Sequence, residues 1–429
     1  MFKLSDPAHL SLWQKTSAEG PSSPFLKGNN KAEVVVIGAG IAGLTTALHL
    51  SEAGIDVAVI EAGEIACGAT GKSGGLIAPD FIRHSPVDIE NEFGPIEGEK
   101  LIKLVGSAAK HCFDLIKKHN ISCEARQDGF WTPAHNDEIA QSLKMRAKQW
   151  KDRGFAVDYY SADQVCQQLG TTFYQGAIKF DEGGSVNPVA LCRGLADIVI
   201  KLGGRIYTQS RVTKMSKIGS DRRVETKMGF IDGKKIVLAA NGGNAQLHPD
   251  LQKTILPLKV IQYATKPYLK EARAEILKDG GAFTDKRPYL FTARFDVFGR
   301  MISALPDFFM PRSEKTLILE ASKRVSDQFS KLKPIKIESM WRGTAWLNST
   351  LLPKIYELDE DVYAIQACNG RGLANNMVIG KEMAESIIKN DKECLSIKPE
   401  KPRPIKGYLI AQTVPSFMML RAYLKQKFF

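Results

Sequence analysis

Long apolar runs are missing from this chain of 429 residues. No stretch reaches the roughly 18 consecutive apolar residues that a membrane-spanning helix needs. The opening stretch, MFKLSDPAHLSLWQKTSAEGPSSPF, also lacks the apolar core of about 7–15 residues that marks a signal peptide. We therefore expect a cytoplasmic protein without a spanning helix.

Metal-binding and disulfide patterns are missing as well. The 7 cysteines are scattered without any C-x-x-C spacing, and the 7 histidines show no H-E-x-x-H or other paired spacing. An odd number of unclustered cysteines in a chain of this size favours reduced thiols. The sequence therefore predicts neither a disulfide framework nor a metal site.

Clustered charge is the third feature that the chain lacks. Lys and Arg outnumber Asp and Glu by 59 to 47, which gives a net charge of +12, but no run of five or more basic residues occurs. Dispersed cations are typical of a solvated basic surface rather than of a dedicated nucleic-acid site. We expect no nucleic-acid partner.

What is present is a βαβ unit near the start of the chain. The four β-branched residues Val34 to Ile37 predict a buried parallel strand, and a glycine turn follows at once. Residues Ile41 to Ala53 have helical spacing and end at Gly54, and Asp56 to Ile60 predict a second strand.

The turn of this unit has G-x-G-x-x-G spacing at Gly38, Gly40 and Gly43. The first glycine permits a tight turn, the second lets the backbone approach a pyrophosphate, and the third lets helix and strand pack closely. Glu61 ends the second strand, where a carboxylate can accept hydrogen bonds from ribose hydroxyls. Together these features predict a dinucleotide site.

The segment GATGKSGGLIAP, residues 68–79, favours FAD over NAD. It is rich in glycine and small residues, which suits backbone lying against a second part of a long, flat cofactor.

Further along, two strands are expected to pair as a hairpin across Asp232-Gly233, and a strand from Val362 leads through a glycine turn into a helix that ends at Lys389. Parallel-strand signals lie near the start, the middle and the end of the chain, with antiparallel-looking strands between them. This pattern predicts two interleaved domains.

The ordered series GAGIAGL, VIEA, GATGKSGG, GGSVNP, KIVLAANGG, WRGTAWLNSTLLPKI and ACNGRGLANNMVIGKEMAE resembles the FAD-dependent D-amino acid oxidase (DAO) family. Within it, the chain is most similar to the branch of γ-glutamylputrescine oxidoreductase and glycine oxidase.

The resemblance implies an α/β fold: a Rossmann-type FAD-binding domain interleaved with an α+β substrate domain that carries a mostly antiparallel sheet. The expected division is an N-terminal arm (1–31), an FAD-binding domain (32–120, 185–250 and 336–390), a substrate domain (121–184 and 251–335) and a C-terminal tail (391–429).

The resemblance also implies which residues contact the cofactor, along the pyrophosphate turn, the ribose, the flavin segment, the adenine and the C-terminal glycine turn. They are Gly38, Gly40, Ile41, Ala42, Gly43, Glu61, Ala62, Gly68, Ala69, Thr70, Lys72, Ser73, Gly74, Gly75, Leu76, Val212, Asn241, Gly242, Asn369, Gly370, Arg371 and Gly372. The FAD is expected to be non-covalent, with Cys368 as the alternative point of attachment.

The implied activity is oxidation of a C–N bond in a small amine or amino acid, similar to γ-glutamylputrescine, with dioxygen or another electron acceptor. Hydride transfer to the flavin gives an imine that water hydrolyses to an aldehyde or keto acid. The cofactor performs the difficult step, so no catalytic side chain is assigned. Candidates for the substrate pocket are Tyr263, Tyr289, Phe291, Arg294 and Trp341.

Two other functions are open at this point: a tRNA-modifying flavoprotein of the same fold, which the basic charge would suit, and a non-catalytic flavin-binding subunit. The apolar and basic C-terminal end suggests weak contact with a membrane surface as an alternative to packing on the protein itself.

Overall fold

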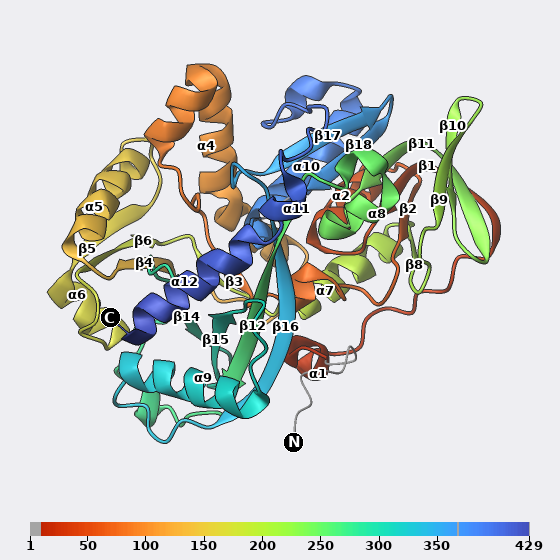
Figure 1. Ribbon diagram of the computed structural model, residues 1–429. Coiled ribbons are helices and arrows are strands. Elements are labelled where there is room, and N and C mark those ends of the chain that lie inside the picture. The colour runs from red at the N-terminus through yellow and green to blue at the C-terminus, as the bar shows by residue number, and fades with distance from the viewer. Residues whose placement is uncertain (1–9, 367–368, 429) are drawn as a thin grey trace.

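The protein is described from a computed structural model that covers residues 10–366 and 369–428. Two sheets lie side by side, and helices cover them (Figure 1). Within the described residues, no helix is both long and apolar enough to cross a bilayer.

The first sheet is the nucleotide-binding layer expected from the βαβ unit. Five strands run parallel because crossover connections link them, and β17 closes one edge in the antiparallel direction. In sheet order the strands are β17 (Lys354–Asp359), β18 (Val362–Gln366), β11 (Gly229–Leu238), β1 (Gly28–Ile37), β2 (Val57–Ile60) and β8 (Arg205–Tyr207), while β9 (Lys214–Ile218) and β10 (Asp221–Glu225) extend from β11.

The second sheet is antiparallel except where β13 meets β4. Its order is β16 (Ile337–Leu347), β12 (Leu256–Thr265), β15 (Met301–Pro306), β14 (Thr292–Phe295), β13 (Ala282–Thr284), β4 (Phe130–Ala134), β6 (Gly176–Phe180) and β5 (Val157–Ser161). A short pair, β3 (Leu76–Ile77) with β7 (Gly184–Ser185), lies outside both sheets. The predicted fold class, Rossmann-type with an interleaved antiparallel domain, is confirmed.

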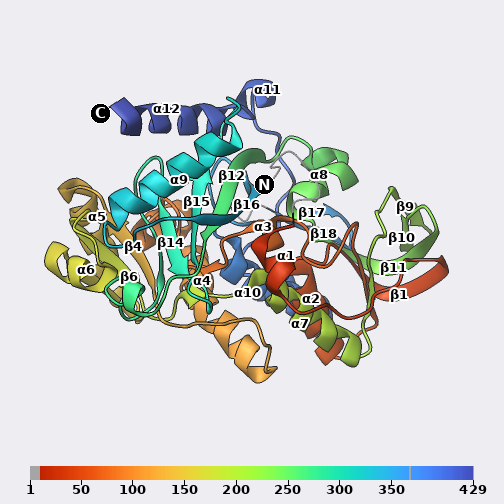
Figure 2. The same ribbon diagram turned by 90° about the horizontal axis from the view of Figure 1, so that it is seen from below.

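The helices in chain order are α1 (Leu12–Thr16), α2 (Ile41–Glu52), α3 (Ala69–Lys72), α4 (Pro86–Lys118), α5 (Asp137–Lys151), α6 (Ala162–Leu169), α7 (Pro188–Lys201), α8 (Asn244–Leu247), α9 (Glu314–Gln328), α10 (Gly372–Lys389), α11 (Tyr408–Ala411) and α12 (Val414–Phe428). Helices α2, α7 and α10 gather beside the first sheet, whereas α12 lies along the outer edge of the molecule above α9 (Figure 2). A large apolar core joins α2, α4, α7 and α10 to the first sheet.

The hairpin predicted at Asp232-Gly233 is wrong. Both residues lie inside β11, where Asp232 pairs with Lys31 and Gly233 with Ala32 of β1. The chain turns instead between β10 and β11, after Glu225. The long parallel pairing with β1 outweighs the local turn preference of Asp-Gly. Glycine is needed at position 233 for packing instead, because a Cβ there would come within 2.6 Å of the Val35 side chain.

The second sheet also extends beyond the expected boundary at residue 336. Strand β16 pairs with β12 over its whole length, so residues 337–347 belong to the antiparallel sheet rather than to the nucleotide-binding layer. The period-2 pattern of an eleven-residue strand does not show which sheet it joins.

Candidate functional site

The turn between β1 and α2 needs glycine at two of its positions. Gly38 has φ +115°, and a Cβ there would lie 2.9 Å from the backbone of Ala239. A Cβ at Gly43 would lie 2.0 Å from the carbonyl oxygen of Gly38. Helix α2 begins after Gly40 without a side-chain cap, so its first amides face the turn with their partial positive charge. This is a cradle for a pyrophosphate.

Glu61 is fixed beside that cradle at the end of β2. Its Oε2 accepts a hydrogen bond from the Ala39 amide (2.8 Å), and its Oε1 accepts one from the Gly63 amide (2.9 Å). The Cys67 thiol donates to the same Oε1 over 3.5 Å. Burial, with the neighbouring Glu61 charge, raises the pKa of Cys67 to about 12, so the thiol stays protonated at neutral pH. The carboxylate keeps lone pairs for ribose hydroxyls.

The glycine-rich segment of residues 68–76 runs from the short helix α3 into β3. The Thr70 Oγ1 accepts a hydrogen bond from the Ile41 amide at the start of α2 (3.3 Å), so this segment meets the cradle directly. A Cβ at Gly71 would lie 2.1 Å from the Ala66 oxygen, and one at Gly75, whose φ is +73°, would lie 2.2 Å from the Val186 oxygen. The backbone here is packed too closely for side chains at these two positions.

Three buried side chains hold three consecutive carbonyls of this segment, and we call them the carbonyl clamp. Trp341 Nε1 donates to the Lys72 oxygen (3.1 Å), Trp13 Nε1 to the Ser73 oxygen (2.8 Å), and Arg294 Nε to the Gly74 oxygen (2.8 Å). The donors come from β16, α1 and β14. The Arg294 guanidinium lies 4.7 Å from the Trp13 ring centre, and the two indoles meet edge to face at 6.0 Å.

The carbonyl clamp changes the role of two predicted pocket residues. Arg294 is 1% exposed, and Trp341 is fully buried. Arg294 also donates through Nη2 to the Val186 oxygen (2.9 Å), so its fork is directed at backbone carbonyls. The structure therefore places Arg294, a candidate for the substrate pocket, in hydrogen bonds to backbone carbonyls instead.

The other three pocket candidates are packing residues too. Tyr263 and Phe291 are 0% exposed in the apolar core of the second sheet. Tyr289, 2% exposed, donates its hydroxyl to the Glu320 carboxylate (2.8 Å) and packs against Tyr423 of α12. In the described structure, aromatic and arginine side chains at these positions build the interior, and the sequence pattern alone does not distinguish that from a pocket.

The remaining predicted cofactor residues lie on loops at the ends of first-sheet strands. Asn241 and Gly242 form a short turn after β11, and a Cβ at Gly242 would lie 2.0 Å from the Trp346 ring. Val212 follows β8, half-buried against the first sheet. Asn369 to Gly372 connect β18 to α10, with positive φ at Asn369 and Gly370. Cys368 lies outside the described residues.

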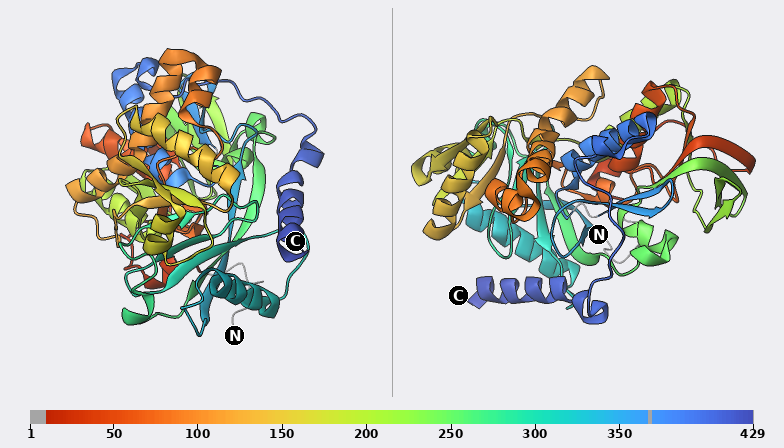
Figure 3. Two further views of the ribbon diagram at one scale, coloured as in Figure 1. Left: turned by 90° about the vertical axis from the view of Figure 1, so that its left-hand side faces the viewer. Right: turned by 90° about the horizontal axis from the view of Figure 1, so that it is seen from above.

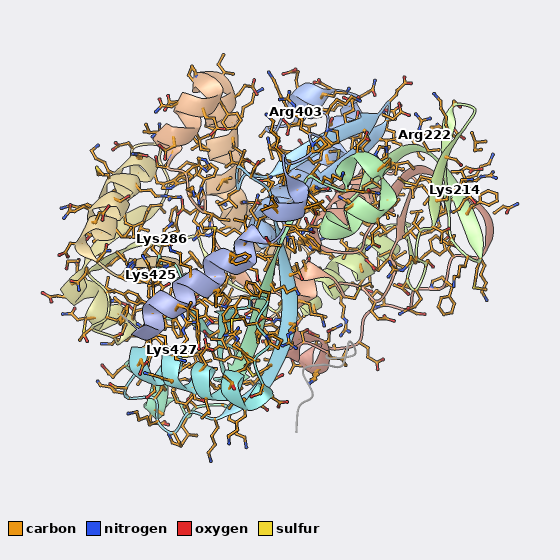
Figure 4. The ribbon with its side chains drawn as sticks, viewed as in Figure 1. Lys214, Arg222, Lys286, Arg403, Lys425 and Lys427 are labelled. Carbon is orange, nitrogen blue, oxygen red and sulfur yellow. The ribbon has the colours of Figure 1, made fainter. Side chains whose placement is uncertain are left out.

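Arg371 at the start of α10 belongs to a buried charged group that the sequence does not reveal. Asp80 is its one carboxylate; it accepts two hydrogen bonds from Arg146 (3.0 and 2.6 Å) and lies 3.6 Å from Arg371 Nη1. Lys286, labelled in Figure 4, is half-buried in the loop between β13 and β14 and donates to the Ile82 oxygen (3.0 Å). Burial, with Arg146 and Arg371 nearby, lowers the pKa of Lys286 to about 7.

These residues fit an FAD. The glycine cradle at the start of α2 suits a pyrophosphate, Glu61 suits a ribose, and the glycine-rich, clamped segment suits a flat ring system. The spacing of the glycines in the sequence was enough to predict the cradle and Glu61. It could not find Trp13 as a clamp residue, because Trp13 is 60 residues from the carbonyl it holds.

Comparison with known proteins gives the same assignment. The model of a family described as FAD dependent oxidoreductase (DAO) matches residues 33–386. The chain is 26% identical to the γ-glutamylputrescine oxidoreductase of Escherichia coli over 389 residues, which cover 90% of both chains. It is 27% identical to a probable oxidoreductase of Haemophilus influenzae, over 87% of this chain and 86% of that one.

Solved structures share the fold. An L-proline dehydrogenase from P. horikoshii superimposes with a TM-score of 0.72 at 19% identity, over 86% of this chain and 96% of the other. A glycine oxidase from Geobacillus kaustophilus gives a TM-score of 0.71 at 16% identity, over 84% and 95%.

Glu61→Gln tests the ribose position. An amide can accept only one of the two backbone hydrogen bonds and places an NH2 group against the other amide, so we expect the Kd of FAD to rise about tenfold, equivalent to about 1.4 kcal/mol. Titration of apoprotein with FAD, followed by flavin fluorescence, measures this. The matched control is Glu33→Gln, an exposed carboxylate at the start of the same unit, and equal Kd values for both variants would remove Glu61 from the site.

Arg294→Lys tests the carbonyl clamp. Lysine keeps the charge but loses the fork that reaches Gly74 and Val186, so FAD should dissociate about tenfold faster and Tm should fall by several degrees. With FAD saturating, KM for the amine should be unchanged. A raised KM with normal FAD retention would instead support substrate contact. Arg205→Lys, in an exposed ion pair with Asp56, is the control.

Lys286→Met tests the buried charged group. The native Lys286 pKa of about 7 lies below the value of about 10.4 for an unfolded chain, so between these pH values the unfolded state binds one more proton. Stability should then rise with pH from 7 to 9, by up to about 1.4 kcal/mol per unit. The variant should lose this slope in urea unfolding of the holoprotein, while exposed Lys278→Met should keep it. Identical slopes in both variants would contradict the assignment.

Proposed function

Because the chain belongs to the DAO family of FAD-dependent oxidoreductases, we propose that it oxidises the C–N bond of a small amine or amino acid resembling γ-glutamylputrescine. The observation that carries this proposal is the match to γ-glutamylputrescine oxidoreductase over 90% of both chains. That match spans the second sheet as well as the nucleotide-binding layer.

The chain's own residues bind and orient the cofactor. The amides at the start of α2 would hold the pyrophosphate and Glu61 the ribose, while the carbonyl clamp fixes residues 72–74 in one conformation. Bound FAD would supply the hydride acceptor for the carbon beside the amine nitrogen, and hydrolysis of the imine product would give an aldehyde or keto acid. A backbone that is already fixed would hold the flavin in its reactive orientation, so that no rearrangement is needed at each turnover.

The start of α10 supplies positive potential. Helix α10 is 18 residues long and has no side-chain cap, so its first amides carry the partial positive charge of the helix dipole. Arg371, the residue before the helix, adds a full charge and is held by the carbonyls of Asp80 and Phe81 (3.3 and 3.4 Å). A negative charge that develops next to this turn is therefore stabilised.

Anaerobic reduction tests the proposal. The holoprotein is mixed without oxygen with γ-glutamylputrescine, putrescine, glycine, sarcosine and D-amino acids, and its visible spectrum is recorded. We expect the oxidised-flavin absorbance to bleach with the γ-glutamylated amine and far less with putrescine, which lacks the glutamyl group. Admitting air then separates an oxidase, which recovers its colour at once, from a dehydrogenase.

Absence of bleaching with every amine would contradict amine oxidation. In that case, tRNA binding that weakens steeply with salt would assign the chain to tRNA modification, the alternative that the basic charge allows. A yellow protein that no amine bleaches and that binds no tRNA would be a flavin-binding subunit.

A further inference from the structure

The C-terminal helices lie on the outside of the molecule. Helices α11 and α12 follow an extended segment and run along the outer edge of the second sheet, in views from below and from above (Figures 2 and 3). The site for FAD lies on other elements, so this surface is separate from the function proposed above.

One face of α12 is attached to the protein. Tyr423 packs on Tyr289 and Phe308, with ring centres 5.6 and 5.2 Å apart, and Ala422 beside it is 7% exposed. Near the start of the helix, the Phe309 amide donates to Ser416 Oγ (2.8 Å). These contacts fix which face of the helix is turned outward.

The outward face is apolar in its first half and basic in its second. Its residues recur at i, i+3, i+4, i+7, i+10 and i+11, the spacing of a single helix face: Val414, Phe417, Met418, Arg421, Leu424 and Lys425. The apolar ones are 42–57% exposed. Just before them, Leu409 and Ile410 of α11 are 80% and 75% exposed, and Phe309 and Met310 beside the helix are each 51% exposed.

The same segment carries charge of one sign. Residues 401–427 hold Lys401, Arg403, Lys406, Arg421, Lys425 and Lys427 and no Asp or Glu, so this short stretch contributes six of the net +12 charges. Arg403, Lys406, Arg421 and Lys425 are exposed and form no ion pair with the described residues. Arg403 lies near one end of the segment, and Lys425 and Lys427 lie at the other (Figure 4).

We propose that the outward face of α11 and α12 docks the enzyme on an anionic lipid bilayer. Phe417 packs on Phe309, with ring centres 4.9 Å apart, and both rings remain more than half exposed. Large exposed apolar side chains of this kind can enter the boundary between headgroups and acyl chains, while neighbouring cations bind the negative surface. A protein partner fits less well, because the segment combines exposed apolar side chains with charge of one sign only, as an anionic bilayer requires. The attached inner face keeps the helix parallel to the membrane.

Vesicle sedimentation of the holoprotein tests the docking. The probes are vesicles of phosphatidylcholine alone and of phosphatidylcholine with phosphatidylglycerol. We expect the chain to sediment with the anionic vesicles and to remain in solution with the neutral ones, and added salt should weaken the binding because the attraction is partly electrostatic.

Phe417→Ser/Lys425→Glu removes one apolar and one basic contact from the outward face and should lower the bound fraction at least about fivefold. The matched control, Met228→Ser/Lys227→Glu, changes an exposed apolar residue and a cation at the turn before β11 and should bind like the native chain. FAD content and Tm of both variants establish that they are folded.

Three outcomes would overturn the proposal. They are failure of the native holoprotein to sediment with anionic vesicles, equal loss of binding in both variants, and equal binding in the outward-face variant and the native chain. A dimer that light scattering detects in the native chain and not in the outward-face variant would assign the face to a second copy of the chain.

Discussion

The carbonyl clamp is the interaction on which the arrangement of the site depends. A segment of glycines and small residues has almost no side chains with which to fix itself, and its free backbone would lose a large conformational entropy on ordering. Trp341, Trp13 and Arg294 supply the missing restraint by each donating to one carbonyl in succession. The donors are buried and the three hydrogen bonds are partly so, which limits competition with water, and loss of a donor leaves a carbonyl without its partner in the protein.

The carbonyl clamp also joins the two sheets and the N-terminal helix α1 at the same segment of the chain. Trp13 comes from α1, Arg294 from β14 and Trp341 from β16, whereas the carbonyls that they hold continue toward the cradle through Thr70. The segment thus connects the nucleotide-binding layer with the antiparallel sheet. A change in any of the three donors alters the backbone segment that both domains share, so its first effect is on the retention of the cofactor.

Features set by residues close together in the sequence could be predicted, whereas features set by long-range contacts could not. The strand, glycine turn, helix and Glu61 follow one another within 30 residues, so sequence pattern was sufficient for the cradle and for the fold class. The hairpin at Asp232-Gly233 failed because a turn preference worth little energy competes with a parallel ladder of nine paired residues. The hydrogen bonds of Arg294 could not be predicted for a related reason, because its carbonyl partner at Gly74 is 220 positions away.

The charged residues show the same difference between what the sequence reveals and what long-range packing decides. The net +12 is visible in the sequence, but its placement is not, and the structure separates the cations into two physical classes. Arg146 and Arg371 pair with the carboxylate of Asp80, and burial together with these two cations lowers the pKa of the nearby Lys286. The cations of α12 lie in water without such burial, next to apolar side chains that water does not favour. A solvated basic surface accounts for exposed cations alone; it does not account for Phe417, Met418 and Ile410 exposed among them.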